Sequence, residues 1–337
     1  MQILYIIQTF KAPEQIQRLV QTIKRSIPNS QIIISHDYTA SYLAPEPLQI
    51  LGAQVLKLKG KGKGVRGSFL MLEGYLDAFK WARIHQIAFD WVINLSGEDY
   101  PTQSLPVIEQ FLRLTHYDGF VEHFEAFSNG KENPWGSAEA SDRYLYQYWR
   151  SGLVMSSNNT LLEKILFRAT FAIHKFWPFL KVCTDHDCFA VGAKARSPIF
   201  NKKFLCYGGA YYHTLSRRCV EYLYNYYENN PEIAAYYRRT LVPDESFIQT
   251  ILINSELFNI SNDYKRYIEF PSEGDTSRPR TLTAKDYPAL IQGNIHFARK
   301  FKPDRDSQIL NLLDARIFKD HALDEPKSVP FNVRIQV

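Results

Sequence analysis

Two adjacent carboxylates, Asp244 and Glu245, stand in the stretch "LVPDESFIQT" at residues 241–250, behind a proline and before a segment with helical spacing. A carboxylate can take the proton of a reacting hydroxyl, so one of the two could be a catalytic general base. They could equally be structural. Pro243 suits the first turn of a helix, Asp244 is a favoured N-cap residue and Glu245 suits the positive end of the helix dipole. Taken alone, the stretch favours this capping interpretation.

Two neighbouring cations, Arg299 and Lys300, occur in "FARKF" at residues 297–301. Arginine offers a planar fork to two oxygens and lysine offers a compact point charge, so the pair could face an anionic group. A solvated basic turn is the alternative. A third stretch, "KGKGKGVRGSF" at 59–69, looks like a phosphate cradle but lacks the spacing of a P-loop.

These groups need a scaffold, and the hydrophobic pattern predicts an α/β fold. Strand-like segments at 3–8, 30–37, 53–58, 89–96 and 118–124 alternate with helical segments at 13–26, 68–85 and 105–115. This alternation predicts a Rossmann-like, mostly parallel central sheet with helices on both faces. Ligands of such sheets bind at the carboxyl ends of the strands. We therefore expect Asp37 and the "SGEDYP" loop, which follow two of these strands, at a ligand site.

The rest of the chain gives fewer signals. An aromatic stretch at 133–149 is expected to be rich in loops, and 159–182 is basic and amphipathic. That segment is expected to pack on the core rather than lie on a membrane surface. Without an internal repeat or a low-complexity linker, we expect a single domain over 1–318 and a tail over 319–337. Residues 1–125 would form mainly the nucleotide-binding half, and 126–318 the acceptor and catalytic half.

Composition excludes several classes of protein. The 337 residues are 45% hydrophobic and 22% charged, as in an ordinary globular protein. The net charge of +5 suits an anionic ligand or an acidic membrane surface but is too small for a dedicated nucleic-acid binder. The start "MQILYIIQTF" reads as a buried strand rather than a signal peptide, and no apolar run reaches the ~18 residues of a membrane span. We expect a cytoplasmic protein, with peripheral association at the inner membrane face as a further expectation.

Several motifs, in order, resemble those of one enzyme family. They are "SHD" at 35–37, "DWVINLSGEDYPTQSLPVIEQFL" from residue 90, "GGAYYHTLSRRCVEYL" from 208, "VPDESFIQTILINS" from 242 and "FARKF". Together they are similar to the core-2/I-branching N-acetylglucosaminyltransferase and peptide O-xylosyltransferase ("Branch") family, glycosyltransferase family 14. The resemblance covers about residues 3 to 315 of the chain. It implies a GT-A type fold, a UDP-sugar donor, inversion at the anomeric carbon, and no metal or other cofactor.

The resemblance also implies roles for single residues. Glu245 matches the family's glutamate and would be the catalytic base, while Asp244 would start the helix. Arg299 and Lys300 match the basic pair that would bind the diphosphate. A second arginine is expected upstream of them, and Arg266 or Arg280 could supply it.

The remaining expected roles concern the two substrates. Candidates for binding the nucleotide or donor are Asp37, Ser96, Gly97, Glu98, Asp99 and Arg66. Asp99 could instead cap the turn before Pro101. Arg66 stands where the family carries a W-G-G turn, a departure that leaves its role open. The acceptor side would be formed by Trp135, Arg143, Tyr211 and Tyr212.

These expectations describe an inverting, metal-independent glycosyltransferase. It would move a sugar such as N-acetylglucosamine or xylose from a UDP-sugar to a hydroxyl of a glycan, glycolipid or protein, in the synthesis of a polysaccharide or glycolipid precursor. No nucleic acid is expected as a partner. Two other functions stay open: a glycoside hydrolase, which needs two separated carboxyl groups, and a non-catalytic carbohydrate-binding protein.

Overall fold

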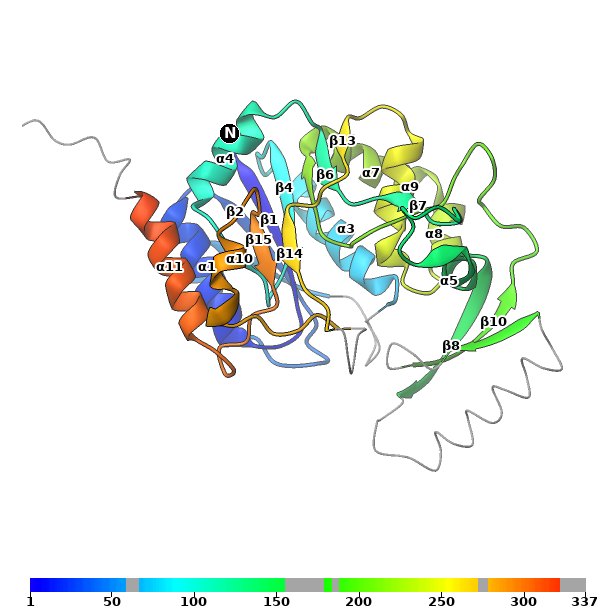
Figure 1. Cartoon of the computed structure of the whole chain (residues 1–337), viewed down its shortest axis with the longest axis horizontal. Helices are drawn as coiled ribbons and strands as arrows, with labels where there is room; N and C mark the ends of the chain where they lie inside the picture. The colour runs from blue at the N-terminus through cyan, green and yellow to red at the C-terminus, as the bar shows by residue number, and fades with distance from the viewer. Residues whose placement is uncertain (59–66, 155–178, 184–187, 272–277, 322–337) are drawn as a thin grey trace, which may run out of the picture.

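The structure is a computed structural model, and it describes residues 1–58, 67–154, 179–183, 188–271 and 278–321. Within these residues the chain forms a seven-stranded central sheet and three smaller sheets. Figure 1 shows the central sheet between two groups of helices.

The central sheet has the strand order β3-β2-β1-β4-β12-β6-β13. Its strands are β1 (Ile3–Thr9), β2 (Gln31–His36), β3 (Ala53–Lys57), β4 (Trp91–Ser96), β6 (Gly119–Val121), β12 (His213–Ser216) and β13 (Ile260–Ser261). Neighbouring strands are parallel except where β12 pairs antiparallel with β4 and β6. The expected mostly parallel sheet is confirmed.

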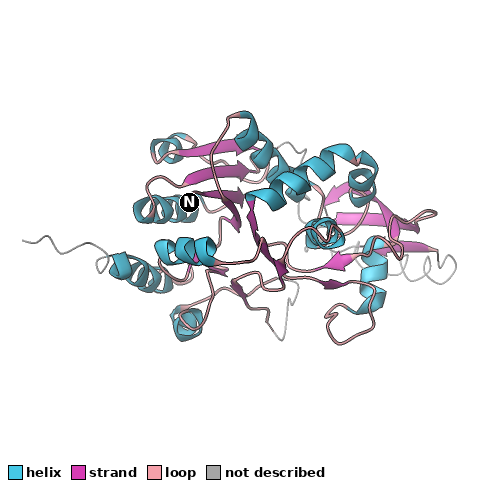
Figure 2. Ribbon diagram, turned by 90° about the horizontal axis from the view of Figure 1, so that it is seen from above, coloured by secondary structure: helices cyan, strands magenta, loops and turns pink. Residues whose placement is uncertain are grey.

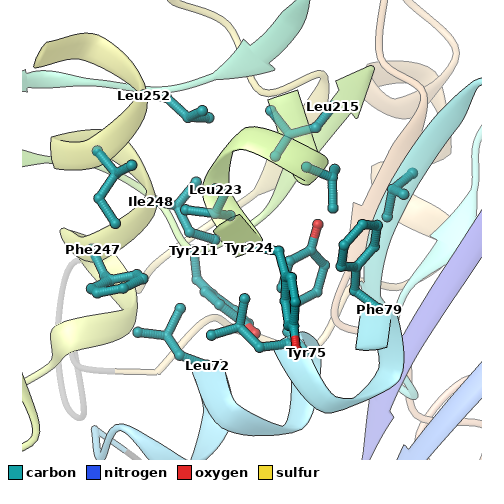
Figure 3. Packing of buried hydrophobic residues seen from close by; sticks show 14 of the residues in the cluster. Leu72, Tyr75, Phe79, Tyr211, Leu215, Leu223, Tyr224, Phe247, Ile248 and Leu252 are labelled. Atoms are coloured by element: carbon teal, nitrogen blue, oxygen red, sulfur yellow. The ribbon is translucent and has the colours of Figure 1, made fainter. Parts of the chain in front are cut away.

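Side chains along a strand alternate between the two faces of the sheet. Both faces therefore carry apolar side chains, and helices cover each of them. From β1, Ile3, Tyr5 and Ile7 join one core cluster, and Leu4 and Ile6 join the other. The first cluster packs against α1 (Pro13–Ser26), α4 (Leu105–Leu114) and α11 (Gln308–His321). The second packs against α3 (Leu70–Ile84), α7 (Arg217–Asn229) and α9 (Phe247–Asn254), and Figure 3 shows this packing. Helices on both faces, as expected, complete the α/β fold.

One small sheet brings distant motifs together. It has the order β14-β15-β5, formed by β14 (Arg266–Ile268), β15 (Phe297–Arg299) and β5 (Tyr100–Pro101). In it Ala298 pairs with Tyr100 and Phe297 pairs with both Pro101 and Arg266. The "FARKF" and "SGEDYP" segments, some 200 residues apart in sequence, are therefore neighbours in space.

A second small sheet, β8-β10-β9, lies at the end of the molecule opposite α11, as Figures 1 and 2 both show. Its strands are β8 (Tyr146–Val154), β9 (Leu180–Cys183) and β10 (Cys188–Lys194). The third small sheet pairs β11 (Tyr207–Gly208) with β7 (Phe124–Glu125).

The structure differs from the sequence-based expectation in several elements. The segment at 133–149, expected to be rich in loops, forms α5 (Gly136–Tyr144) and the start of β8. Ala140 and Tyr144, one helical turn apart, are both buried, so tertiary packing stabilises α5. A short helix, α2 (Glu46–Ile50), precedes β3. At the other end, α11 continues to His321, past the expected domain boundary at 318.

Asp244 does not cap a helix, contrary to the capping interpretation. Pro243, Asp244 and Glu245 form a separate 3₁₀ turn, η1 (Pro243–Glu245), and Ser246 occupies the N-cap position of α9. The Asp244 side chain is buried, and its Oδ1 has no hydrogen-bond partner among the described residues. The two adjacent acids therefore lie in a tight turn rather than in the first turn of a helix.

Candidate active site

The carboxyl ends of the parallel strands meet at one edge of the central sheet. Thr9 of β1 is opposite His36 of β2, and Gln8 is opposite Ser96 of β4. Asp37 and the loop from Ser96 to Asp99 therefore lie at the edge where ligands of such sheets bind, as expected.

Asp37 uses one of its carboxylate oxygens within its own turn. Oδ1 accepts hydrogen bonds from the backbone nitrogen of Thr39 at 2.9 Å and from its hydroxyl at 2.6 Å. This arrangement orders the chain that leaves β2. A role of Asp37 in nucleotide binding stays a prediction.

Asp99 is held inside the protein, and a contact of Asp99 with the nucleotide stays a prediction. Its side chain is 1% exposed and accepts hydrogen bonds from the backbone nitrogen of Ser96 at 2.9 Å and from the Ser96 hydroxyl at 2.6 Å. It also pairs with Nε of Arg299 at 3.1 Å. Burial raises the pKa of Asp99, and the Arg299 charge acts in the opposite direction. The turn-capping alternative is the one that the structure supports.

The other two residues of this loop are also closely packed. A Cβ added to Gly97 would lie 3.0 Å from side-chain atoms of Ile16 and Thr9, which is a tight contact. Glu98 is mostly buried and pairs with Lys11 at 3.2 Å. Only a small part of this loop thus faces solvent, and nucleotide contacts of Ser96, Gly97 and Glu98 stay predictions.

Arg299 and Lys300 stand beside this loop in different environments. The Arg299 guanidinium is held by Asp99 and lies over the ring of Tyr212 at 4.5 Å. Lys300 is half-buried, and its ammonium makes no ion pair within 4.0 Å in the described part of the chain. Burial lowers the pKa of Lys300, opposed by the nearby carboxylate of Glu98. Lys300 is therefore the cation of this pair that has charge available for a ligand.

Both candidates for the second diphosphate arginine make contacts within the protein. Arg266 is buried, and its guanidinium donates to the backbone carbonyls of Tyr264, Lys265, Asn94 and His213. Burial lowers the pKa of Arg266 to about 10. Arg280 binds two carboxylates, Glu269 and Asp286, the latter through both terminal nitrogens. Both arginines are thus held by contacts within the protein, and a role of either in binding the diphosphate stays a prediction. Arg66 lies outside the described residues.

Glu245, the expected base, lies in a more open position. Its side chain is 35% exposed, and Oε2 accepts a hydrogen bond from Nη1 of Arg143 at 2.8 Å. Arg143 also pairs with Glu139, one turn earlier on α5, and its guanidinium lies 4.3 Å from the ring centre of Trp135. Glu139 of α5 and Trp135 at its N-terminus thus fix the cation that orients Glu245. Arg143 and Trp135, expected on the acceptor side, do lie together beside it.

Two glycines allow the chain to approach Glu245 closely. A Cβ on Gly208 would lie 2.3 Å from the ring of Trp135, and one on Gly209 would lie 1.9 Å from the backbone oxygen of Glu122. The backbone nitrogen of Gly209 donates to the carbonyl of Glu245 at 2.9 Å. Side chains at these two positions would separate η1 from the sheet.

Tyr211 and Tyr212, expected on the acceptor side, are buried, and a contact of either with the acceptor stays a prediction. The Tyr211 hydroxyl donates to the side-chain oxygen of Gln8, and Figure 3 shows the Tyr211 ring among buried side chains of α3 and α9. Tyr212 lies beneath Arg299, with its ring centre 5.7 Å from that of Tyr211. The segment 208–212 therefore connects Glu245 at one end with Arg299 and Lys300 at the other.

Sequence reasoning missed three residues of this arrangement. Glu139 shares Arg143 with Glu245, and Lys11 neutralises Glu98. Glu122 accepts a hydrogen bond from the backbone nitrogen of Ala210 at 2.9 Å and holds the segment 208–212. For Glu139, the spacing of four residues to Arg143 was a usable signal. The partners of Lys11 and Glu122 are too distant in sequence for any such signal.

Two broader expectations concern metals and membranes. Across the described ranges, no three His, Cys, Asp or Glu side chains are grouped so that they could hold a metal ion. Independence from metal stays a prediction. Searching those same residues also finds no helix of the length and apolarity that crossing a bilayer requires. Most of the amphipathic segment at 159–182 lies outside the described residues.

Comparison with known proteins identifies relatives. The family model described as Core-2/I-Branching enzyme matches residues 54–290. Beta-glucuronosyltransferase GlcAT14B of Arabidopsis thaliana is 25% identical over 244 residues, which are 71% of this chain and 46% of the relative. GlcAT14A of the same plant is 24% identical over 231 residues, which are 67% of this chain and 42% of that protein. The chain thus spans about half the length of the curated relatives it matches.

Solved structures show weaker likeness. Mouse xyloside xylosyltransferase 1 in its apo form aligns with a TM-score of 0.32 and 10% identity, over 88% of this chain and 97% of that one. A nucleoside-diphosphate-sugar pyrophosphorylase of Vibrio cholerae aligns with a TM-score of 0.33 and 13% identity, over 76% and 89%. The family model, in contrast, covers well over half of the sequence. The chain belongs to the Core-2/I-branching enzyme family.

Proposed function

We propose that this protein is an inverting glycosyltransferase that moves a sugar from a UDP-sugar to an acceptor hydroxyl without a metal ion. Membership of the Core-2/I-branching enzyme family supports the reaction class. The observation that carries the proposal is the partly exposed Glu245, oriented by Arg143 and connected through the segment 208–212 to Arg299, the chain neighbour of Lys300. A proton acceptor and a cation that could bind phosphate thus border one region of the molecule.

In the proposed reaction, the acceptor oxygen attacks C1 of the donor sugar on the face opposite UDP. A new C1–O bond forms, the bond between C1 and the diphosphate breaks, and its electron pair stays on UDP. Glu245 takes the proton of the acceptor hydroxyl and later releases it to solvent. General base catalysis of this kind contributes roughly 10²- to 10⁴-fold in rate.

The leaving diphosphate gains negative charge as its bond breaks, and fixed cations can stabilise that charge. We assign Lys300 to this role. Arg299 would add to the local positive potential, although Asp99 offsets part of its charge. Arg143 would hold the carboxylate of Glu245 toward the acceptor, with the Trp135 ring offering an apolar surface to a sugar.

The two adjacent acids argue against a glycoside hydrolase. Such enzymes use two carboxyl groups about 5 to 9 Å apart that face the same glycosidic bond. Asp244 is buried whereas Glu245 is half-exposed, so the two do not present themselves equally to one bond. A non-catalytic carbohydrate-binding protein would need neither a base nor an unpaired lysine beside the sheet edge.

The experiment is a calorimetric screen of UDP and UDP-sugars in EDTA, combined with an assay for slow UDP release. UDP-N-acetylglucosamine and UDP-xylose belong to the panel, and UDP-glucuronate is added because the matched plant relatives are beta-glucuronosyltransferases. We expect binding and slow hydrolysis of at least one UDP-sugar. Strict dependence on Mn²⁺ would contradict the metal-independent mechanism. Binding without turnover by the wild type, unchanged in Glu245→Gln, would indicate a binding protein instead.

The acceptor and the cellular site belong to the same proposal. A glycan, glycolipid or protein hydroxyl would accept the sugar, in the synthesis of a polysaccharide or glycolipid precursor. The expected cytoplasmic site and peripheral contact with the membrane would be tested by cell fractionation, in which the protein should divide between the soluble and salt-extractable membrane fractions.

A further inference from the structure

Asp244 is a buried carboxyl group for which the proposed reaction has no use so far. It is 6% exposed, directly precedes Glu245 in η1, and its Oδ1 makes no hydrogen bond within the described residues. Burying a carboxyl oxygen without a partner is unfavourable, since the lost contacts with water are not replaced. Such a group is more easily explained when a ligand supplies the partner.

The surroundings of Asp244 place it at the start of α3. The backbone nitrogen of Val242 donates to the carbonyl of Gly67 at 3.2 Å, and Arg150 donates to the same carbonyl. Asp244 interacts electrostatically with Tyr211, whose hydroxyl also donates to the carbonyl of Met71 at 3.3 Å. This region adjoins the carboxyl end of β1, because the side chain of Gln8 donates to Met71 at 2.6 Å.

Contacts within the protein link Asp244 to both groups that the proposed reaction uses. Glu245 follows it in the chain, and the contacts from Tyr211 to Tyr212 and from Tyr212 to Arg299 lead to the cationic side. In the reaction, the donor sugar must lie between the base, which meets the acceptor, and the cations, which meet the diphosphate. A polar group in this intermediate position is placed to meet the donor sugar itself.

We propose that Asp244 accepts a hydrogen bond from a hydroxyl of the donor sugar and makes the site select a neutral sugar over a uronic acid. This inference rests on the proposed function. A carboxylate binds hydroxyl groups well, whereas it repels the carboxylate of a glucuronyl group, and Glu245 beside it adds to that repulsion. The charged groups that interact with Asp244 are Glu245, Arg143 and Arg150.

The test compares UDP with four UDP-sugars by calorimetry in EDTA. The ligands are UDP, UDP-glucose, UDP-N-acetylglucosamine, UDP-xylose and UDP-glucuronate, and the proteins are the wild type, Asp244→Asn, Asp244→Ala and a control. Burial and the neighbouring Glu245 raise the pKa of Asp244 to about 7, so measurements at about pH 8 keep most of it ionised. Asp90→Asn is the control, because it makes the same charge change just before β4, at the opposite edge of the sheet.

We expect the wild type to bind one neutral UDP-sugar more tightly than UDP and to bind UDP-glucuronate more weakly than that sugar. Asp244→Ala should lower the affinity for the neutral UDP-sugar about 10- to 100-fold, while the affinity for UDP should stay within about twofold of the wild-type value. Asp244→Asn should bind UDP-glucuronate about tenfold more tightly than the wild type does. A misfolded variant cannot produce this gain, and the control should behave as the wild type.

Several results would overturn the inference. They are an equal loss of UDP and UDP-sugar affinity in both Asp244 variants, unchanged sugar preference, or a wild type that prefers UDP-glucuronate. An equal loss accompanied by a lower melting temperature would assign Asp244 a structural role, with a buried water as the missing partner. In each of these cases UDP still binds the wild type, so the proposed function stands. If the wild type binds neither UDP nor any UDP-sugar, the proposed function itself fails.

Discussion

Two arginine–carboxylate pairs in this protein consist of the same kinds of side chain but differ in their surroundings. Arg299 pairs with Asp99 at 3.1 Å, and Arg143 pairs with Glu245 at 2.8 Å. The arginine side chains are similarly covered, at 16% and 17% exposed, whereas Asp99 is 1% exposed and Glu245 is 35% exposed. The pairs differ in the carboxylate, which in one case is enclosed by the protein and in the other meets solvent.

This difference distinguishes a carboxylate that orders the protein from one that could meet a substrate. All of the contacts of Asp99 come from the protein, so it orders the "SGEDYP" loop and fixes Arg299. Glu245 keeps an exposed edge while Arg143 fixes its orientation. Only a carboxylate of the second kind can reach a substrate hydroxyl. An ion pair therefore indicates a reactive group only when its carboxylate is accessible.

The largest expected effect is on turnover, in Glu245→Gln. Loss of the base should lower the transfer rate roughly 10²- to 10⁴-fold, while UDP affinity and the melting temperature stay close to those of the wild type. Transfer assays, calorimetry with UDP and thermal unfolding together check this. If this variant transferred sugar at the wild-type rate, the accessible carboxylate would not be the base, and the proposed difference between the two pairs would fail.

The reciprocal change, Asp99→Asn, should act on stability. It leaves the buried Arg299 without its counter-ion, and breaking a buried pair in this way costs about 3 to 5 kcal/mol of unfolding free energy. Denaturant unfolding measures that cost, and Glu245→Gln is the matched control because it makes the same charge change in the accessible pair. Equal stability of the two variants would show that burial does not separate the pairs.

Lys300→Ala tests the cation that has no carboxylate partner among the described residues. We expect UDP affinity to fall about tenfold through loss of one charged contact, with little change in stability. Lys80→Ala, which removes an exposed lysine from the later half of α3, is the control. Raising the salt concentration should weaken UDP binding by the wild type more than by Lys300→Ala, and the opposite order would exclude Lys300 from the diphosphate site.

The last expected effect is a pH-dependent stability difference in Asp244→Asn. The folded protein holds a proton on Asp244 up to about pH 7, whereas the unfolded chain releases it near the ordinary pKa of about 4. Wild-type stability should therefore fall as pH rises between these values, because the folded state binds more protons. The variant lacks this penalty and should gain stability relative to the wild type on going from pH 4 to pH 8, with an upper limit of about 4 kcal/mol for a shift of this size. A constant difference across this range would contradict the raised pKa.

Periodicity predicted much of the fold correctly. In α1, Ile16, Leu19, Val20 and Ile23 recur at helical spacing, and all four are buried as that spacing predicts. The strands β1, β2 and β4 are mostly apolar and largely buried, because both faces of the sheet are covered. The helix α5 was missed, since its stability depends on packing of Ala140 and Tyr144 by distant parts of the chain.

For the candidate site, sequence alone determined the residue types and their order: two adjacent acids at 244 and 245, a glycine pair at 208 and 209, and a basic pair at 299 and 300. The sequence could not show which residue of each pair is buried and which is accessible. Tertiary structure decided that Asp244 is buried and Glu245 is accessible. It also decided that Asp99 pairs with Arg299, while Lys300 has no ion pair in the described chain. Arg266 and Arg280 are held by contacts within the protein. The physical reason is that burial and charge pairing depend on neighbours hundreds of residues apart, which a local pattern does not contain.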